Sequence, residues 1–114
     1  MNDEQLCQQI DTLLSHVWMV RTFIKHSEEA EDDDDLRDVH RDLYDFMLAL
    51  GEATQNQDWA KYLKMAKKKL KRLKRATELF SEIQPEISSH TNFQMAERSL
   101  RVSVAQIEQL LTAE

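Results

Sequence analysis

Apolar residues recur at helical spacing along nearly the whole chain. In the first segment, alternating intervals of four and three residues separate Leu6, Ile10, Leu13, Val17, Val20 and Ile24. Such intervals place side chains on one stripe of a helix, whereas a half-buried strand would alternate at every second residue. The pattern recurs three more times, and the whole chain holds one glycine and one proline. It predicts four helices and no sheet.

Breaks in the pattern define where the first two helices should end. The first helix is expected from about residue 3 to residue 27. The acidic run 32–35 then provides the joint, the cap and the first turn of the second helix, because acids are favourable beside a helix N-terminus. The second helix should end near Gly51, because glycine takes the left-handed C-cap conformation freely.

Three further signals bound the last two helices. Asp58 or Asn56 should cap the third helix, since a side-chain oxygen there can accept a hydrogen bond from the first turn. Pro85 should stop that helix, because the residue before a proline avoids helical backbone angles. Thr91 and Gln94 have the spacing of a capping box at the start of the fourth helix.

Short joints between long helices make successive helices antiparallel. The fold class we expect is therefore all-α, an antiparallel up-and-down four-helix bundle in which residues 1–114 form a single domain. Leu14, Trp18 and Phe23 widen the apolar stripe of the first helix, which suits packing against two neighbours. The same helix keeps a strict seven-residue repeat, which is typical of a coiled-coil seam. A helical hairpin or three-helix unit that completes its core by dimerisation therefore stays open as the alternative.

Composition narrows the class of protein further. The 114 residues are 41% hydrophobic and carry a net charge of −6, and no run of about 20 apolar residues could span a membrane. The acidic N-terminus does not fit a signal peptide, and the lone Cys7 fits a reducing compartment, so we expect a cytoplasmic protein. A net negative charge repels nucleic acid and anionic lipid, so neither is an expected partner.

Charge is unevenly distributed along the chain. Residues 28–38 hold eight acids against Arg37 alone, and residues 61–75 hold nine lysines and arginines without an acid. The third helix therefore offers a basic surface for phosphate or for an acidic protein, unless its lysines only solvate the outer face of a long helix.

We assign binding to the basic residues of this third helix. The candidates are Lys64, Lys67, Lys68, Lys71, Arg72, Lys74 and Arg75. Two of them, Lys74 and Arg75, should pass near the start of the second helix, where Asp38 and Asp42 could pair with them within one chain or between copies. Exposed ion pairs contribute only about 0–1 kcal/mol each, so such pairs would direct association rather than hold it.

Two histidines lie where the bundle would bring helix ends together. His26 ends the first helix and His90 precedes the fourth, and each has an acid at helical spacing, Glu29 and Glu86 respectively. Two imidazoles and two carboxylates can hold a divalent transition metal. No histidine of this chain follows an acid by three positions, however, as the Glu-x-x-His motif of di-iron bundles requires.

No catalytic motif stands out from chance. His16 and His40 flank apolar stripes, where a histidine most often hydrogen-bonds a neighbouring helix. We therefore expect a small interaction or structural module without catalysis or a cofactor. In this hypothesis the basic helix and the acidic joint direct binding to a protein partner or to a second copy, as in a homodimer. The alternative is a metal-binding bundle whose site lies at the pole of His26 and His90.

Overall fold

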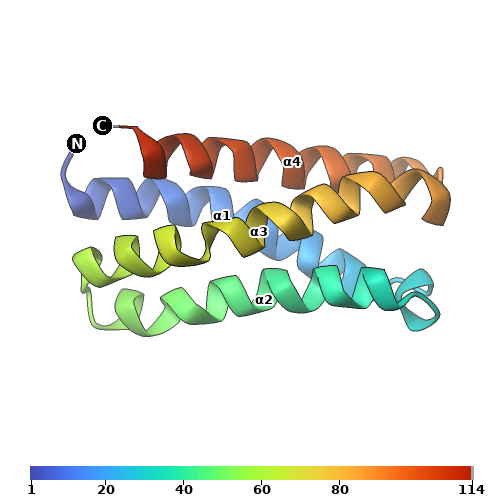
Figure 1. The fold of residues 1–114 in the computed structure, drawn as a ribbon, viewed down its shortest axis with the longest axis horizontal. Helices are drawn as coiled ribbons and strands as arrows, with labels where there is room; N and C mark the ends of the chain where they lie inside the picture. Colours follow the sequence, from blue (N-terminus) through green and yellow to red (C-terminus); the bar gives the residue numbers. More distant parts are fainter. Residues whose placement is uncertain (114) are drawn as a thin grey trace.

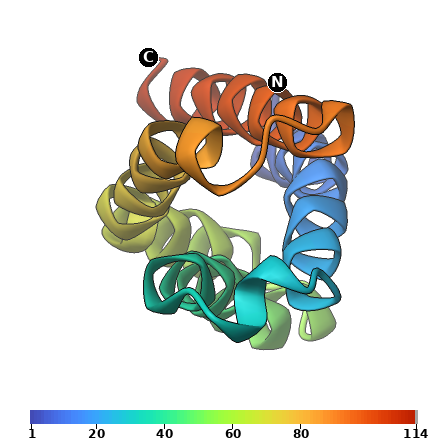
Figure 2. The same cartoon turned by 90° about the vertical axis from the view of Figure 1, so that its right-hand side faces the viewer.

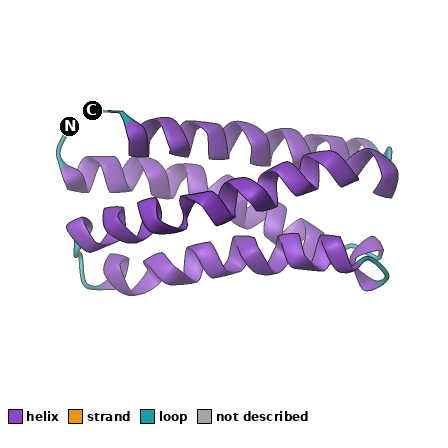
Figure 3. Ribbon diagram, viewed as in Figure 1, coloured by secondary structure: helices purple, strands orange, loops and turns teal. Residues whose placement is uncertain are grey.

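The computed structural model describes residues 1–113, and its regular elements are all helical (Figures 1 and 3). Four helices and one short 3-10 turn follow one another along the chain: α1 (Asp3–Lys25), η1 (Glu29–Glu31), α2 (Asp34–Gln55), α3 (Trp59–Ile87) and α4 (Thr91–Thr112). They run alternately up and down, so the predicted antiparallel four-helix bundle is confirmed.

The helices stand at the corners of a square when the bundle is viewed end-on (Figure 2). Helix α1 packs against α2 and α4, and α3 packs against the same two helices from the opposite corner. The start of α1 and the end of α4 lie at one pole (Figure 1). The other pole brings together the end of α1, the turn η1, the start of α2, the end of α3 and the start of α4. The chain thus closes its core by itself, without the second copy that the alternative fold would need.

The inward stripes predicted from the sequence form one continuous core. Among its largest fully buried side chains are Ile10, Leu36, Phe46, Tyr62, Phe80 and Leu100. Each such apolar side chain contributes about 1.5–3 kcal/mol when it leaves water. Burial of these stripes, more than helix propensity, holds four helices of this length together.

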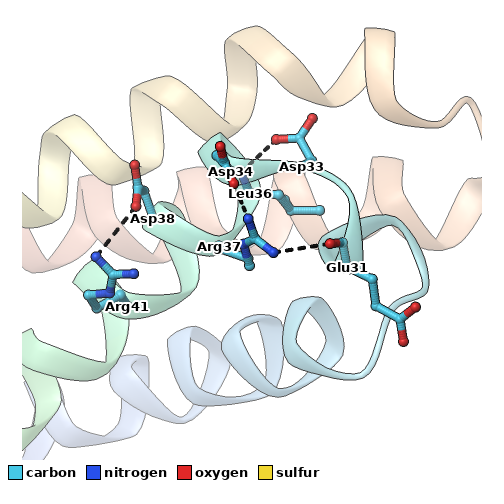
Figure 4. A network of polar contacts seen from close by, with 7 residues as sticks. All are labelled: Glu31, Asp33, Asp34, Leu36, Arg37, Asp38 and Arg41. Atoms are coloured by element: carbon cyan, nitrogen blue, oxygen red, sulfur yellow. Dashed lines mark hydrogen bonds and ion pairs between the residues drawn. The ribbon is translucent and has the colours of Figure 1, made fainter.

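Side-chain caps begin the helices where acceptors are available. Asn2 and Gln5 form a capping box at the start of α1. The Asp33 carboxylate accepts a hydrogen bond from the Leu36 amide at 2.8 Å, as Figure 4 shows, and Asp58 accepts one from an amide of α3 at 3.1 Å. The acidic joint and the Asp58 cap are therefore confirmed.

The predicted end of α2 is wrong. The helix runs past Gly51 to Gln55, and Gly51 does not take a left-handed conformation. Ala53 in this last turn is fully buried, so packing continues the apolar stripe beyond the glycine. The residue with a left-handed backbone is Gln57, with a φ of 53°.

The predicted end of α3 is also wrong, because Pro85 lies inside the helix. A proline removes one backbone hydrogen bond, but the chain keeps its helical path to Ile87, whose side chain packs against the core. The Gln84 side chain is buried and its Nε2 donates to the Ser88 carbonyl at 2.8 Å. This bond satisfies a carbonyl at the helix end, just beyond the proline.

The cap of α4 is His90 rather than Thr91. The Nδ1 atom of His90 accepts a hydrogen bond from the Asn92 amide at 3.0 Å. Thr91 is the first residue of the helix proper, so its expected capping box with Gln94 does not form.

None of the helices in the described part of the chain combines the length and the apolar character needed to cross a bilayer.

Candidate functional site between α1 and α2

A buried arginine lies between α1 and α2. Arg21 is only 6% exposed, and it occupies a position on the inward stripe of α1. Its Nη1 lies 3.0 Å from the Nε2 of His40 in α2, and its Nη2 donates to the Thr22 hydroxyl at 3.4 Å. Its Nε is buried without a hydrogen-bond partner, and no ion pair of residues 1–113 includes this guanidinium. A buried charge without a counter-charge is costly, which marks Arg21 as a residue with a special role.

Two aromatic rings cover the Arg21 guanidinium. Its Cζ lies 4.1 Å from the centre of the Trp18 ring and 5.1 Å from that of Tyr44. Both distances fall within the range of a cation–π interaction. Trp18 and Tyr44 remain 44% and 37% exposed as residues, so the predicted inward packing of Trp18 is only partial. They offer an aromatic surface to solvent directly beside a positive charge.

His40 is held in its neutral form. Its partial burial and the positive charges of Arg21, Lys25 and Arg41 lower the pKa of the imidazole below its ordinary value of 6.5. Since Nε2 faces the arginine, it acts as the acceptor and the proton resides on Nδ1. The expectation that His40 hydrogen-bonds a neighbouring helix is confirmed, whereas His16 is exposed on α1.

A pocket of about 430 Å³ opens beside this cluster at the corner of α1, η1 and α2. Its lining comes from three elements: Lys25, Ala30, Glu31, Arg37 and His40. Arg37 donates to the Glu31 carbonyl at 3.0 Å and forms an ion pair with Asp34, as Figure 4 shows. Three of the five lining side chains can therefore donate hydrogen bonds into the pocket.

The same face of the bundle continues into a second pocket of about 400 Å³ on the Trp18 side of the cluster. Leu14, Ser15, Trp18 and Met47 contribute to its lining. The α1–α2 face thus carries a cationic pocket, a pair of aromatic rings and a more apolar pocket. This set of groups can bind a ligand that has both an aromatic ring and a strongly anionic group.

The basic residues predicted to bind lie mainly on the outer face of α3. Six of the seven are exposed: Lys64, Lys67, Lys68, Lys71, Arg72 and Arg75. The half-buried Lys74 pairs with Glu108 of α4 at 2.6 Å, and this bond raises the pKa of the lysine. Asp38 pairs instead with Arg41 of its own helix at 3.6 Å (Figure 4). In residues 1–113 no ion pair joins the basic helix to the acidic joint.

The residues proposed for a metal do not converge. His26 follows the end of α1 and Glu29 lies in η1, whereas Glu86 lies in the last turn of α3. His90 already uses its Nδ1 as the cap of α4. In the described chain no three histidines, cysteines, aspartates or glutamates are grouped so that they could hold a metal ion.

The single cysteine is buried at the opposite pole. Its Sγ lies 3.7 Å from the Trp59 carbonyl, and burial together with the nearby Asp11 and Asp3 raises the pKa of the Cys7 thiol to about 11. The hydroxyl of the fully buried Tyr62 donates a hydrogen bond to Asp11 Oδ1 at 2.6 Å, and burial raises the pKa of this tyrosine too. These groups tie α1 to α3 and are poorly suited to nucleophilic chemistry.

The cluster of Arg21, His40, Trp18 and Tyr44 between α1 and α2 was not predicted from the sequence. One signal was present, because Arg21 falls four residues after Val17 and three before Ile24, on an otherwise apolar stripe. A charged residue at such a position needs a partner or a function. The partner residues on α2 could not be found without knowing which faces meet.

The sequence model of the cobalamin adenosyltransferase family matches residues 5–109. The chain belongs to this family. The match spans all four helices and includes the α1–α2 cluster. Searches among curated proteins and among solved structures give no match.

Membership of the cobalamin adenosyltransferase family corrects the function expected from the sequence. The family is one of enzymes, so the expectation of a non-catalytic interaction module directed by the basic helix and the acidic joint is wrong. The alternative of a metal-binding bundle is not supported either, because the described residues hold no group of ligands for a metal ion. Both expectations came from charge blocks and histidine spacing, which carry no information about a reaction.

Proposed function

We propose that this protein transfers the adenosyl group of ATP to a cobalamin. The observation that carries the proposal is the family match over residues 5–109. Cobalamin adenosyltransferases take ATP and cobalamin as substrates, so the expectation that the protein needs no cofactor is not confirmed.

The reaction is a displacement at carbon. The cobalt of a reduced cobalamin, in its Co(I) state, supplies both electrons of a new bond to the C5′ atom of ATP. The bond between C5′ and its oxygen breaks, and triphosphate leaves with that electron pair. A protein speeds this step by holding the two substrates in line and by stabilising the negative charge that gathers on the leaving group.

The α1–α2 face supports the nucleotide half of this reaction. An adenine ring stacks favourably on exposed aromatic side chains, and Trp18 and Tyr44 provide such a surface. A triphosphate needs cations and hydrogen-bond donors, which Lys25, Arg37 and His40 supply in the adjoining pocket. Arg21 connects the two sets of groups, because it contacts both aromatic rings and also His40, which lines the pocket.

The proposal is tested by measuring the formation of adenosylcobalamin. The protein is incubated without oxygen with ATP and chemically reduced cobalamin, and the product is identified by the light-induced cleavage of its cobalt–carbon bond. We expect a rate that is proportional to protein concentration and that disappears on heat unfolding. A rate equal to that of the mixture without protein, with the protein shown to be helical by circular dichroism, would overturn the proposal.

A further inference from the structure

We propose that His40 and Arg21 form a pH-sensitive latch between α1 and α2, which opens when His40 takes up a proton. In the closed latch the Arg21 guanidinium is buried against the rings of Trp18 and Tyr44. In the open latch the guanidinium leaves this position for solvent and uncovers the rings. The latch belongs to the protein alone and operates whether or not a substrate is present.

The closed state holds Arg21 by a single short contact to an acceptor. Its Nη1 lies 3.0 Å from the Nε2 of His40, whereas the only other contact of the guanidinium, to the Thr22 hydroxyl, is 3.4 Å long. Its Nε has no hydrogen-bond partner, and no ion pair of residues 1–113 neutralises its charge. Arg21 is only 6% exposed, so a buried charge depends on one neutral imidazole.

Protonation of His40 removes that acceptor. A neutral imidazole accepts a hydrogen bond at one ring nitrogen, whereas both ring nitrogens of the protonated form are donors. The 3.0 Å contact then joins two positive groups that repel each other. A buried guanidinium without an acceptor or a counter-charge is costly, and the long, flexible stem of an arginine can carry its charge to water. Release of Arg21 is therefore the expected response.

Cations on both helices keep the latch closed at neutral pH. Partial burial lowers the pKa of His40, and the positive charges of Arg21, Lys25 and Arg41 lower it further. The imidazole is thus neutral at pH 7.5 and keeps its acceptor. Because the pKa of the closed state lies below the ordinary value of about 6.5, the latch should open only as pH falls below that value.

The acidic segment 28–38 favours the open state once the proton is bound. Two of its eight acids form ion pairs with α2 arginines, Asp34 with Arg37 and Asp38 with Arg41 (Figure 4), and Asp33 caps α2. The other five are exposed and form no ion pair within residues 1–113: Glu28, Glu29, Glu31, Asp32 and Asp35. The side chain of His40 lines the same pocket as Glu31. A protonated imidazole is therefore repelled by Arg21 and attracted by this segment.

Trp18 can report the state of the latch by its fluorescence. The Arg21 Cζ lies 4.1 Å from the centre of the Trp18 ring, so its departure uncovers one face of the indole. The chain has a second tryptophan, Trp59, which packs against the core at the start of α3, and Trp59→Phe removes its signal. Acrylamide, an uncharged quencher, then measures access to Trp18 alone. Since Trp18 is 44% exposed in the closed state, we expect the quenching constant to rise by up to about twofold from pH 7.5 to pH 5.0.

Two substitutions of His40 in the Trp59→Phe background should fix the latch in each state. Glutamine keeps an acceptor oxygen but takes up no proton in this range, so His40→Gln should stay weakly quenched at both pH values. Arginine stays positively charged throughout, so His40→Arg should be strongly quenched at both. Circular dichroism at each pH establishes that the helices persist, which distinguishes opening of the latch from unfolding.

His16→Gln provides the matched control. His16 is exposed on α1, only two residues before Trp18, and it forms no hydrogen bond with Arg21. Its replacement removes an imidazole near the reporter without touching the latch. The rise in quenching at low pH should therefore persist in His16→Gln and disappear in His40→Gln.

Three results would overturn the latch: no rise in quenching while the protein stays helical, an equal rise in His40→Gln, or loss of the rise in His16→Gln. Should the His40 variants fail to fold, Arg21→Met gives a second test, because a protein without the guanidinium has nothing to release. Its quenching constant should not depend on pH, and a dependence equal to that of native Arg21 would refute the latch. The experiment contains neither ATP nor cobalamin, so its result does not depend on adenosyl transfer.

Discussion

Replacing Arg21 by methionine should make the protein more stable and a weaker binder of triphosphate. The change removes a hydrogen bond to His40, worth about 1.5 kcal/mol. It also removes the contacts with the rings of Trp18 and Tyr44, worth together about 1.5 kcal/mol. Against these losses, it removes an unpartnered buried Nε that costs about 2 kcal/mol. It also removes a buried charge without a counter-charge, which costs several kcal/mol.

With the charge penalty taken as about 2–3 kcal/mol, the balance favours methionine by about 1–2 kcal/mol. Methionine is unbranched and flexible, so its side chain can fill the space that the arginine stem occupied. For a domain of about this size each kcal/mol corresponds to a rise in Tm of about 4–8 °C. A residue whose removal stabilises the fold but weakens ligand binding is retained for function rather than for structure.

Urea unfolding followed by circular dichroism measures this change in stability. Arg41→Met is the matched control, because Arg41 is 69% exposed and pairs only with Asp38 of its own helix. We expect this control to change the free energy of unfolding by less than about 0.5 kcal/mol. Nuclear magnetic resonance titration gives a second readout, since loss of the Arg21 charge should raise the pKa of His40.

A different outcome would refute the reasoning about Arg21. If Arg21→Met lowered the free energy of unfolding by more than 1 kcal/mol and left triphosphate affinity unchanged, the arginine would be a structural residue whose contacts outweigh its desolvation.

Three further predictions follow from buried groups. Folding lowers the pKa of His40, so below about pH 6.5 the unfolded chain takes up a proton that the folded chain does not. The free energy of unfolding of the native protein should therefore fall as pH falls through 6.5. His40→Gln should lose less of this free energy between about pH 7.5 and pH 5.5 in the same urea assay. The Cys7 thiol has a pKa of about 11 and no exposed surface, so it should react with a thiol reagent at pH 8 only as fast as the protein opens. Mild urea should therefore accelerate labelling. Rapid labelling of the folded protein would show that Cys7 is not buried. Phe80→Ala should cost about 3–5 kcal/mol of unfolding free energy, because the ring is fully buried, whereas Lys67→Ala on the exposed face of α3 should cost less than about 0.5 kcal/mol.

Local chemistry explains which parts of the fold were predictable. The apolar spacing revealed four helices because each must bury one stripe, and Asp33 and Asp58 were recognisable as caps because their oxygens act within three residues. The helix ends predicted at Gly51 and Pro85 were wrong because tertiary packing extends α2 and α3 past residues that would end an isolated helix. Propensity is a local quantity, and burial of the following turn outweighs it.

The candidate site was hidden for a different reason. Arg21 meets His40 and Tyr44 only because one face of α1 packs against one face of α2, and spacing within a single helix does not reveal that pairing. The lysines of α3 were predicted to bind because they are numerous in one segment. The α1–α2 pocket instead takes a few cations from separate segments of the chain. Self-association of the chain stays a prediction, which a native mass spectrum would test.

Transfer of labelled carbon tests the proposed reaction most directly. ATP that carries carbon-13 at C5′ is incubated with the protein and reduced cobalamin, and the cobalamin product is examined by mass spectrometry and carbon nuclear magnetic resonance. Adenosyl transfer requires the label to appear on the carbon bonded to cobalt, with one triphosphate released for each product. Unlabelled cobalamin and intact ATP after incubation with the folded protein would contradict the assignment of this chain as an adenosyltransferase.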